Sequence, residues 1–307
     1  MNGVAIEVVR PGLCDLVMDG GRPGWARAGV PTGGAADQAA LAAANRLVGN
    51  RPDAPALEIV ARGPQLHFPR GGVIALTGAP FRAARAAGLV AGWNQTLVLA
   101  AEEILRLGEP AEGYRCWLAI RGGLAVEPVL GSASALPQAG WGGVTGRPLR
   151  VGDRLFSHPA GGGVHLLRAR PPGVESAAPL RVVAGPQASA LTDTGLANLF
   201  GGCFRVDAAS DRRGIRLTGP GVAGKAQAFP TQGVLPGAIQ VPPDGQPIIL
   251  GWDGPVTGGY PVAATVIGAD LPRLAQLKPG AEVRFATVSV DDARALAPPE
   301  WLVEDWA

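Results

Sequence analysis

Short apolar runs between glycine and proline turns recur along this chain, and they constrain its fold more than any other feature. They include "GVIALTG", "TLVLAAEEILRLG" and "YRCWLAIRGG". The 46 glycines and 29 prolines among 307 residues follow no collagen-like period. Because 47% of residues are hydrophobic and only 17% are charged, such frequent turns indicate many short antiparallel strands around a substantial core. The sequence therefore predicts a mainly β protein.

Three segments are exceptions and predict short helices. The segment 34–50, "GAADQAALAAANRLVGN", places Leu41, Ala44 and Leu47 on one face and ends at Gly49. A second helix is expected within 186–202. A third, in 269–280, is expected to begin at a cap formed by Asp270 and to end at Pro279-Gly280.

A stretch without clear pattern, from about residue 158 to residue 180, divides the chain into two β-rich parts. We expect a first subdomain at 1–160, a connection at 161–180 and a second subdomain at 181–307. The tail "PPEWLVEDWA" carries Trp301 and Trp306 among acidic residues. It is expected either to cap the protein's own barrel or to contribute to a partner interface.

Several classes of function receive no support from the sequence. The net charge is +2 and the arginines are scattered, which argues against a nucleic-acid or membrane-surface partner. The three cysteines, Cys14, Cys116 and Cys203, are far apart, so neither a disulfide framework nor a metal site is predicted. No signal peptide, membrane span, P-loop or dinucleotide fingerprint is recognisable. A cytoplasmic protein is the expectation.

Histidine catalysis is not indicated. The three histidines are His67, His158 and His165, and nothing in the sequence places one beside a nucleophile. His67 alternates with Leu66 and Phe68 in an expected strand, which favours a structural or solvent-facing role.

The glycine-rich turn at 19–38 offers Asp19, Arg22, Thr32 and Asp37 before the expected first helix. Backbone N–H groups of such a loop can bind an anion, and an arginine can hold a carboxylate with two hydrogen bonds. The alternative is structural: Asp37 caps the helix and Arg22 pairs with Asp19 at the surface.

Two further turns carry polar groups. The segment "SDRRGIRLTGP" holds Arg212, Arg213 and Arg216, which suits a carboxylate or phosphate but equally a solvated strand end. In "GWDGPVTGGYP", Asp253 and the Thr257–Tyr260 stretch could converge over a tight turn, although β-hairpins commonly use such residues.

These segments together resemble a known family. The motifs follow one another in the family's order over about residues 8–285: "GVPTGGAADQAALAAANRLVGN", "AIRGGL…VLGSAS", "GRPLRVGDRL", "SDRRGIRLTGP" and "GVLPGAIQVPPDGQPIILGWDGPVTGGYP". The chain is similar to the biotin-dependent carboxyltransferase, or allophanate hydrolase subunit 2, family. That family includes the C subunit of bacterial 5-oxoprolinase, KipA and the carboxyltransferase region of urea carboxylase.

The resemblance implies two cyclophilin-like β-barrel subdomains. It also implies a partner, a KipI-like or allophanate hydrolase subunit 1 protein that serves as the B subunit, with a LamB/YcsF-like protein as a possible third component. The implied function is the C subunit of a 5-oxoprolinase-like complex, which hydrolyses 5-oxoproline with ATP and is inactive without its partners. The alternatives are a biotin-dependent carboxyltransferase that acts on a urea-like amide through carboxybiotin, and a non-catalytic regulator of a KipI-like protein.

Taken with the resemblance, the turns give a set of candidate site residues. We expect Asp19, Arg22, Asp253 and Tyr260 to be catalytic. Substrate binding is expected from Asp37, Arg212, Arg216, Gln240, Thr257, Gly258 and Gly259. No metal is predicted.

The chain departs from the family pattern at several of these turns. Leu16 and Met18 stand where the family has Thr and Gln, and Thr231-Gln232 stands where it has Ser-Glu. Because an amide does not titrate, Gln232 cannot transfer a proton as a glutamate could. These changes point to a divergent substrate or a weakened activity.

Overall fold

The computed structural model describes residues 3, 5–85, 88–89, 92–173, 178–225, 229–298 and 300–305. The chain divides into two compact units. The first comprises residues 1–22, 33–173 and 300–307, and the second comprises residues 23–32 and 174–299.

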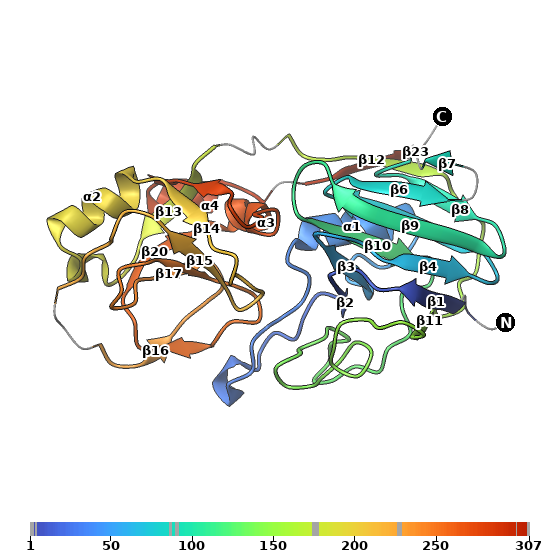
Figure 1. Ribbon diagram of the computed structural model, residues 1–307, viewed down its shortest axis with the longest axis horizontal. Helices are drawn as coiled ribbons and strands as arrows, with labels where there is room; N and C mark the ends of the chain where they lie inside the picture. The colour runs from blue at the N-terminus through green and yellow to red at the C-terminus, as the bar shows by residue number, and fades with distance from the viewer. Residues whose placement is uncertain are drawn as a thin grey trace. The chain divides into compact units, whose positions relative to one another are not determined.

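The first unit contains two antiparallel sheets (Figure 1). The larger has the order β11-β1-β4-β9-β6-β7, with β1 (Ala5–Arg10), β4 (Gln65–Phe68), β6 (Phe81–Arg85), β7 (Gly88–Leu89), β9 (Glu103–Pro110) and β11 (Arg154–Phe156). The smaller has the order β2-β3-β10-β5-β8, with β2 (Cys14–Met18), β3 (Ala56–Val60), β5 (Gly72–Gly78), β8 (Thr96–Leu99) and β10 (Arg115–Ile120).

The smaller sheet is covered on both faces. One face shares a core with the larger sheet, to which Ile59 and Leu118 contribute. The other face is covered by helix α1 (Gln38–Leu47): the Thr77 hydroxyl donates to the Ala40 carbonyl oxygen at 2.7 Å, and the Thr96 hydroxyl donates to that of Leu47 at 2.6 Å. This double cover explains why β3 and β10 are buried at every position, including Glu58 in β3 and Arg115 in β10.

A third, two-stranded sheet brings the C-terminal segment into the first unit. Strand β12 (Leu167–Arg170) pairs antiparallel with β23 (Leu302–Asp305), and Trp301 beside it is buried. The sequence-based boundaries differ from this arrangement, since they assigned 161–180 to a connection and 300–305 to the second subdomain. Trp306 lies outside the described residues.

The second unit is built on an eight-stranded sheet with the order β21-β14-β15-β18-β17-β20-β13-β22. Its strands are β13 (Leu180–Ala184), β14 (Phe204–Val206), β15 (Gly214–Thr218), β17 (Ala238–Gln240), β18 (Ile248–Leu250), β20 (Val262–Val266), β21 (Glu282–Val283) and β22 (Phe285–Thr287). Only Arg284 separates β21 from β22, although they occupy opposite ends of the order. The sheet must therefore curl until its two edges nearly meet, as in a barrel.

A two-stranded sheet and several helices complete this unit. The sheet pairs β16 (Gln232–Gly233) antiparallel with β19 (Thr257–Gly258). The helices are α2 (Asp193–Gly201), α3 (Leu271–Leu274) and α4 (Val290–Ala295), with 3-10 turns η1 (Ala26–Ala28), η2 (Ala188–Ala190) and η3 (Gly268–Asp270), and all but η1 follow Leu180.

The mainly β prediction is confirmed, and so are the first two helices. The third is much shorter than expected, and the Asp270 side chain makes no capping hydrogen bond. Asp270 instead accepts from the Arg181 backbone N–H at 2.7 Å and forms ion pairs with Arg181 and Arg273. A tertiary contact thus takes the carboxylate that local sequence assigned to the cap.

Candidate functional site

The carboxylate of Asp19 connects two segments of the first unit through hydrogen bonds. Asp19 follows β2 and is 8% exposed. Its Oδ1 accepts from the Ser132 and Ser134 hydroxyls at 2.5 and 2.6 Å and from the Gly21 N–H at 2.8 Å, and its Oδ2 accepts from the Ala133 N–H at 2.6 Å. These donors come from backbone or neutral side chains, so they fix the turn at 19–21 to the segment 132–134.

Arg22 binds the same segment. It is 1% exposed and donates from Nε to the Val129 carbonyl oxygen at 3.4 Å and from a terminal nitrogen to that of Ser134. The structural alternative placed Asp19 and Arg22 at the surface, and the burial of both residues contradicts it. The sequence motif "VLGSAS" carries these partners, but their distance along the chain concealed the contact.

Asp37 caps helix α1, as the structural alternative for this residue predicts. Its carboxylate accepts from the Ala40 N–H at 2.9 Å. Burial raises the pKa of Asp37 to about 6, against the lowering effect of hydrogen bonds from Ala40 and Ala39. The negative charge of Glu58 also raises this pKa. Asp37 and Glu58 therefore mark the start of the helix as a buried acidic region.

Glu58 is a buried residue that the sequence analysis missed. Its Oε2 accepts from the Ala36 N–H at 2.8 Å, and its Oε1 lies 3.5 Å from Nε of Arg115. A carboxylate inside the apolar run "ALEIV" was the available signal, since buried glutamates are rarely without a partner.

The two departures in β2 occupy packing positions. Leu16 and Met18 are 2% and 0% exposed. Their side chains lie on the face opposite Asp15 and Val17, because side chains alternate along a strand. The hydroxyl and amide of the family pattern are thus replaced by buried apolar groups.

The second unit holds its buried aspartate with an arginine. Asp253 is 4% exposed and receives two hydrogen bonds from Arg212, from Nε at 2.7 Å and from a terminal nitrogen at 2.9 Å. Side-by-side bonding of this kind fixes both groups in one plane. The other two arginines of the motif differ: Arg213 pairs with Asp211 at the surface and Arg216 is exposed. Arg212 thus already binds a carboxylate of this protein, whereas the substrate contact expected of Arg216 stays a prediction.

The glycine loop at 257–260 leaves β19 toward solvent. Thr257 and Gly259 are exposed, and Tyr260 is 45% exposed. Asp253 is buried against Arg212, and its convergence with Thr257 and Tyr260 over one turn stays a prediction.

Gln240 lies beneath this loop. It is 4% exposed, and its amide nitrogen donates to the Tyr260 carbonyl oxygen at 3.4 Å. A Cβ atom at Gly258 would lie 2.4 Å from the same nitrogen. Only a glycine at 258 leaves room for the Gln240 amide.

A second amide contact supports the other side of the loop. Gln187 and Gln232 exchange two hydrogen bonds of 2.9 Å, and the Gln187 oxygen also accepts from the Val262 N–H at 3.0 Å. Sequence analysis identified Gln232 as a departure but not its partner, which lies in the motif "GPQ".

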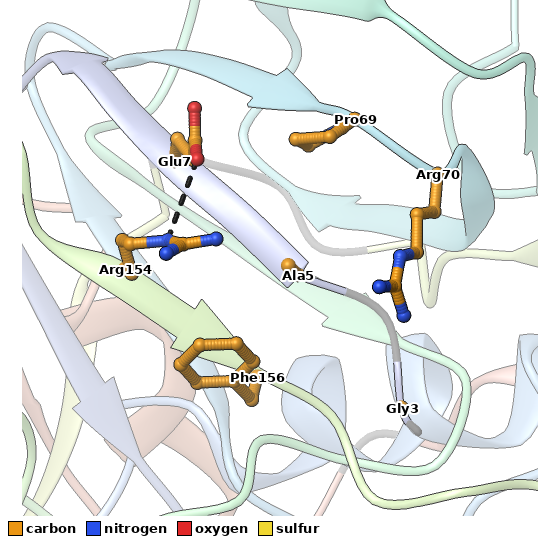
Figure 2. Close-up of a pocket in the computed structure, with 7 residues that line it drawn as sticks. All are labelled: Gly3, Ala5, Glu7, Pro69, Arg70, Arg154 and Phe156. Atoms are coloured by element: carbon orange, nitrogen blue, oxygen red, sulfur yellow. Dashed lines mark ion pairs between the residues drawn. The ribbon is translucent and has the colours of Figure 1, made fainter. Parts of the chain in front are cut away.

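A separate hollow of about 350 Å³ lies in the first unit and is lined by none of the expected site residues. Figure 2 shows Glu7 and Arg154 on one side of it, 3.4 Å apart in an ion pair, and Arg70 on the other side. Glu7 also lies 3.2 Å from His67, whose second ring nitrogen is 3.0 Å from Glu102. His67 thus belongs to a half-exposed ionic row across the sheet, in agreement with the structural role expected for it.

The described residues contain no group of three or more His, Cys, Asp or Glu side chains placed to hold a metal ion. Their helices are all too short or too polar to cross a membrane.

The sequence matches the family model for the carboxyltransferase domain, subdomain A and B, over residues 28–287. The chain belongs to this family. The matched range includes Asp37, the Arg212–Asp253 pair and the glycine loop, and it begins after Asp19 and Arg22.

Relatives of this carboxyltransferase-domain protein fall into two groups. The C subunit of 5-oxoprolinase from Escherichia coli is 36% identical over 94% of this chain and 93% of its own length, and that from Haemophilus influenzae is 32% identical over 91% and 90%. The urea amidolyase of Saccharomyces cerevisiae is 32% identical over 95% of this chain, which spans only 17% of that larger protein.

Solved structures show the same fold. The K. lactis urea amidolyase superposes with a TM-score of 0.85 at 31% identity, over 96% of this chain and 19% of its own. The Kluyveromyces lactis urea carboxylase gives 0.83 at 32% identity, over 96% and 28%. The relatives are thus subunits or regions of multi-component enzymes, which supports an enzyme-associated subunit here.

Proposed function

We propose that this carboxyltransferase-domain protein is the C subunit of a cytoplasmic 5-oxoprolinase-like complex. The complex would use ATP to hydrolyse 5-oxoproline, with a KipI-like B subunit and a LamB/YcsF-like third component. The observation that carries this proposal is the 36% identity to the C subunit of Escherichia coli 5-oxoprolinase, which extends over nearly the full length of both chains.

The reaction imposes a clear requirement on the site. Opening a resonance-stabilised lactam places negative charge on the carbonyl oxygen, and fixed hydrogen-bond donors stabilise that charge. Thr257 and Tyr260 are exposed in the second unit, and each carries a hydroxyl that can donate to such an oxygen. We therefore assign substrate contact to the glycine loop, Thr257, Gly258, Gly259 and Tyr260.

The buried charged residues suit a positioning role. The oxygens of Asp253 accept from Arg212, and those of Asp19 accept from the segment 132–134. A carboxylate whose lone pairs are already occupied is poorly placed to remove a proton from a substrate. We assign Arg212 and Asp253 to holding the backbone of the second unit. We assign Asp19 and Arg22 to holding the turn at 19–22 within the first unit, and Asp37 to the start of helix α1.

The test is reconstitution with the partner proteins and an assay of ATP-dependent 5-oxoproline opening. Tyr260→Phe removes one donor, and its kcat is expected to fall about 100-fold, as for loss of an oxyanion donor. Tyr114→Phe is the matched control, because Tyr114 is the chain's other tyrosine and lies outside the loop. Equal activity of both variants would refute the role of Tyr260.

A second candidate is biotin-dependent carboxyl transfer to a urea-like amide, which the likeness to urea amidolyase and the family model favour. The Thr257 and Tyr260 hydroxyls suit the ureido oxygen of biotin as well as a lactam oxygen. Carboxybiotin, when bound, would supply the carboxyl group, and the loop would orient the acceptor amide. Turnover of carboxybiotin without opening of 5-oxoproline selects this function. Tight binding of the KipI-like partner with silence in both assays would instead establish a non-catalytic regulator.

A further inference from the structure

In the pair formed by Gln187 and Gln232, the arrangement of hydrogen-bond donors and acceptors is fixed. Each amide nitrogen donates to the other side chain's oxygen, and both distances are 2.9 Å. A pair of amides could satisfy this pattern in two ways, with both groups turned over together.

A backbone N–H group of β20 selects one of these two orientations of the amides. The Val262 N–H donates to the Gln187 oxygen at 3.0 Å. If the Gln187 amide turned over, its NH2 group would face the Val262 N–H, donor against donor. The Gln187 oxygen therefore points toward Val262, and position 232 must supply one donor to that oxygen and one acceptor to the Gln187 nitrogen.

A glutamine meets this requirement at every pH, whereas a glutamate meets it only when protonated. An ionised carboxylate can accept from the Gln187 nitrogen, but its second oxygen would face the Gln187 oxygen, acceptor against acceptor. The carboxylic acid restores the donor. The glutamate that stands here in the family pattern would thus be held at an elevated pKa by these surroundings.

The pair lies where it can fix the glycine loop. Gln232 pairs with Gly258 in the two-stranded β16–β19 sheet, and Val262 follows the loop two residues after Tyr260. On the other side, the Gln240 amide contacts the Tyr260 carbonyl oxygen and fills the space beside Gly258. Both ends of the loop are therefore held by uncharged amides.

We propose that Gln187 and Gln232 are a matched positioning pair that fixes the 257–260 loop, and that position 232 transfers no proton. The effect of this pair on turnover rests on the proposed function, but its effect on the loop does not. The substitution of Glu by Gln then makes the loop's position independent of pH.

The experiment compares wild type with Gln232→Glu by NMR of ¹⁵N-labelled protein between pH 4 and pH 9, following the amides of Gly258, Gly259 and Val262. In the variant these signals are expected to shift with a midpoint at about pH 6 or above, against roughly 4.3 for an ordinary glutamate. Below the midpoint they should return to the wild-type positions. A midpoint near 4.3, or no change at these residues, overturns the proposal.

Gln246→Glu is the matched control. The Gln246 oxygen accepts from the Gly219 N–H at 2.9 Å, and a carboxylate can make the same bond. This variant should leave the 257–260 signals unchanged throughout. Gln232→Met removes both hydrogen bonds while keeping a side chain of similar volume, and it should shift the same signals at all pH values. If Gln232→Glu does not fold, this variant still shows how the loop responds to loss of the pair.

The pH dependence of kcat/KM in the reconstituted complex separates a positioning role from a merely structural one. The kcat/KM of Gln232→Glu is expected to fall about tenfold above the NMR midpoint and to recover below it, a limb that wild type lacks. Higher turnover of the variant at alkaline pH would show that a carboxylate at 232 is catalytic and overturn the proposal. If the NMR result holds but the wild-type complex is inactive, the proposed function fails and the positioning pair stands.

Discussion

The two units stabilise buried aspartates by different means. Among the described residues of the first unit, the carboxylate of Asp19 accepts from hydroxyl and backbone donors, and Asp15 accepts from the Gly12 N–H at 2.5 Å. Among the described residues, nothing donates to the other oxygen of Asp15. In the second unit Asp253 and Asp270 are both held by arginines.

This difference gives the units opposite responses to pH. Burial raises the pKa of Asp15 to about 7, only partly offset by the Gly12 hydrogen bond. In the second unit burial acts in the same direction on Asp270, but hydrogen bonds and charge from Arg181 and Arg273 outweigh it and lower the pKa. A raised folded-state pKa costs stability as pH rises through it, and a lowered one costs stability as pH falls through it. Neutral donors and arginines are therefore not equivalent ways to bury a carboxylate.

The largest expected effect comes from removing one charge of an ion pair. Asp253→Asn removes the negative charge that forms an ion pair with the Arg212 guanidinium, which is 10% exposed, and should cost about 3–5 kcal/mol of unfolding free energy. Asp19→Asn places an amide NH2 group against hydroxyl and backbone donors that carry no charge. It should cost about 1–3 kcal/mol of unfolding free energy. Urea unfolding followed by hydrogen exchange within each unit measures both. Equal losses would show that the type of donor does not matter.

Asp15→Asn should stabilise the first unit at alkaline pH. The variant removes the cost of ionising a buried carboxyl, which is about 1.4 kcal/mol per unit of pKa and hence of the order of 4 kcal/mol above pH 7. Below pH 4 the two proteins should be equally stable. Unfolding free energies at pH 4 and pH 8 test this, and a gain that is the same at both pH values would contradict it.

A smaller, opposite effect is expected in the second unit of the wild-type protein. Because the pKa of Asp270 is lowered, the contacts of this carboxylate with Arg181 and Arg273 are complete above about pH 4. They should be lost only on further acidification. Hydrogen exchange of β13 and α3 should accelerate below pH 4, while β2 in the first unit, which carries Asp15, should become more protected as pH falls from 8 to 5. Parallel behaviour of the two units would refute the comparison.

The smallest expected effect concerns the helix caps. Thr192 caps α2 by accepting from the Gly195 N–H at 3.0 Å, so Thr192→Ala should cost about 1 kcal/mol at every pH. Asp37→Asn keeps an acceptor at the cap of α1, and its gain in stability over wild type should grow as pH rises from about 4 to about 6 and stay constant above that. Thermal melting at pH 5 and pH 8 separates the two, and a pH-dependent loss for Thr192→Ala would be inconsistent with a neutral cap.

Local signals predicted much of the fold. Turn residues and short apolar runs indicated the strands, including "PIIL" as β18 (Ile248–Leu250), and the alanine-rich pattern indicated α1 with Asp37 at its cap. Each of these depends on residues that are neighbours in sequence.

Long-range pairing could not be predicted in the same way. The Arg212–Asp253 bond joins residues 41 positions apart, and Gln187 meets Gln232 across 45. Nothing in the flanking residues selects one buried partner over another of the same type. The cap expected from the Asp270 side chain fails for the same reason, because Arg181, 89 positions away, holds this carboxylate.

The pairing of β12 with β23 has a consequence for folding during synthesis. Arg168 and Glu304, which form an ion pair across this small sheet, are 136 positions apart, and nearly all of the second unit lies between them. A ribosome therefore releases the residues of the eight-stranded barrel before it releases β23. The second unit can complete its fold first, whereas the first must hold an unpaired strand edge until its partner emerges.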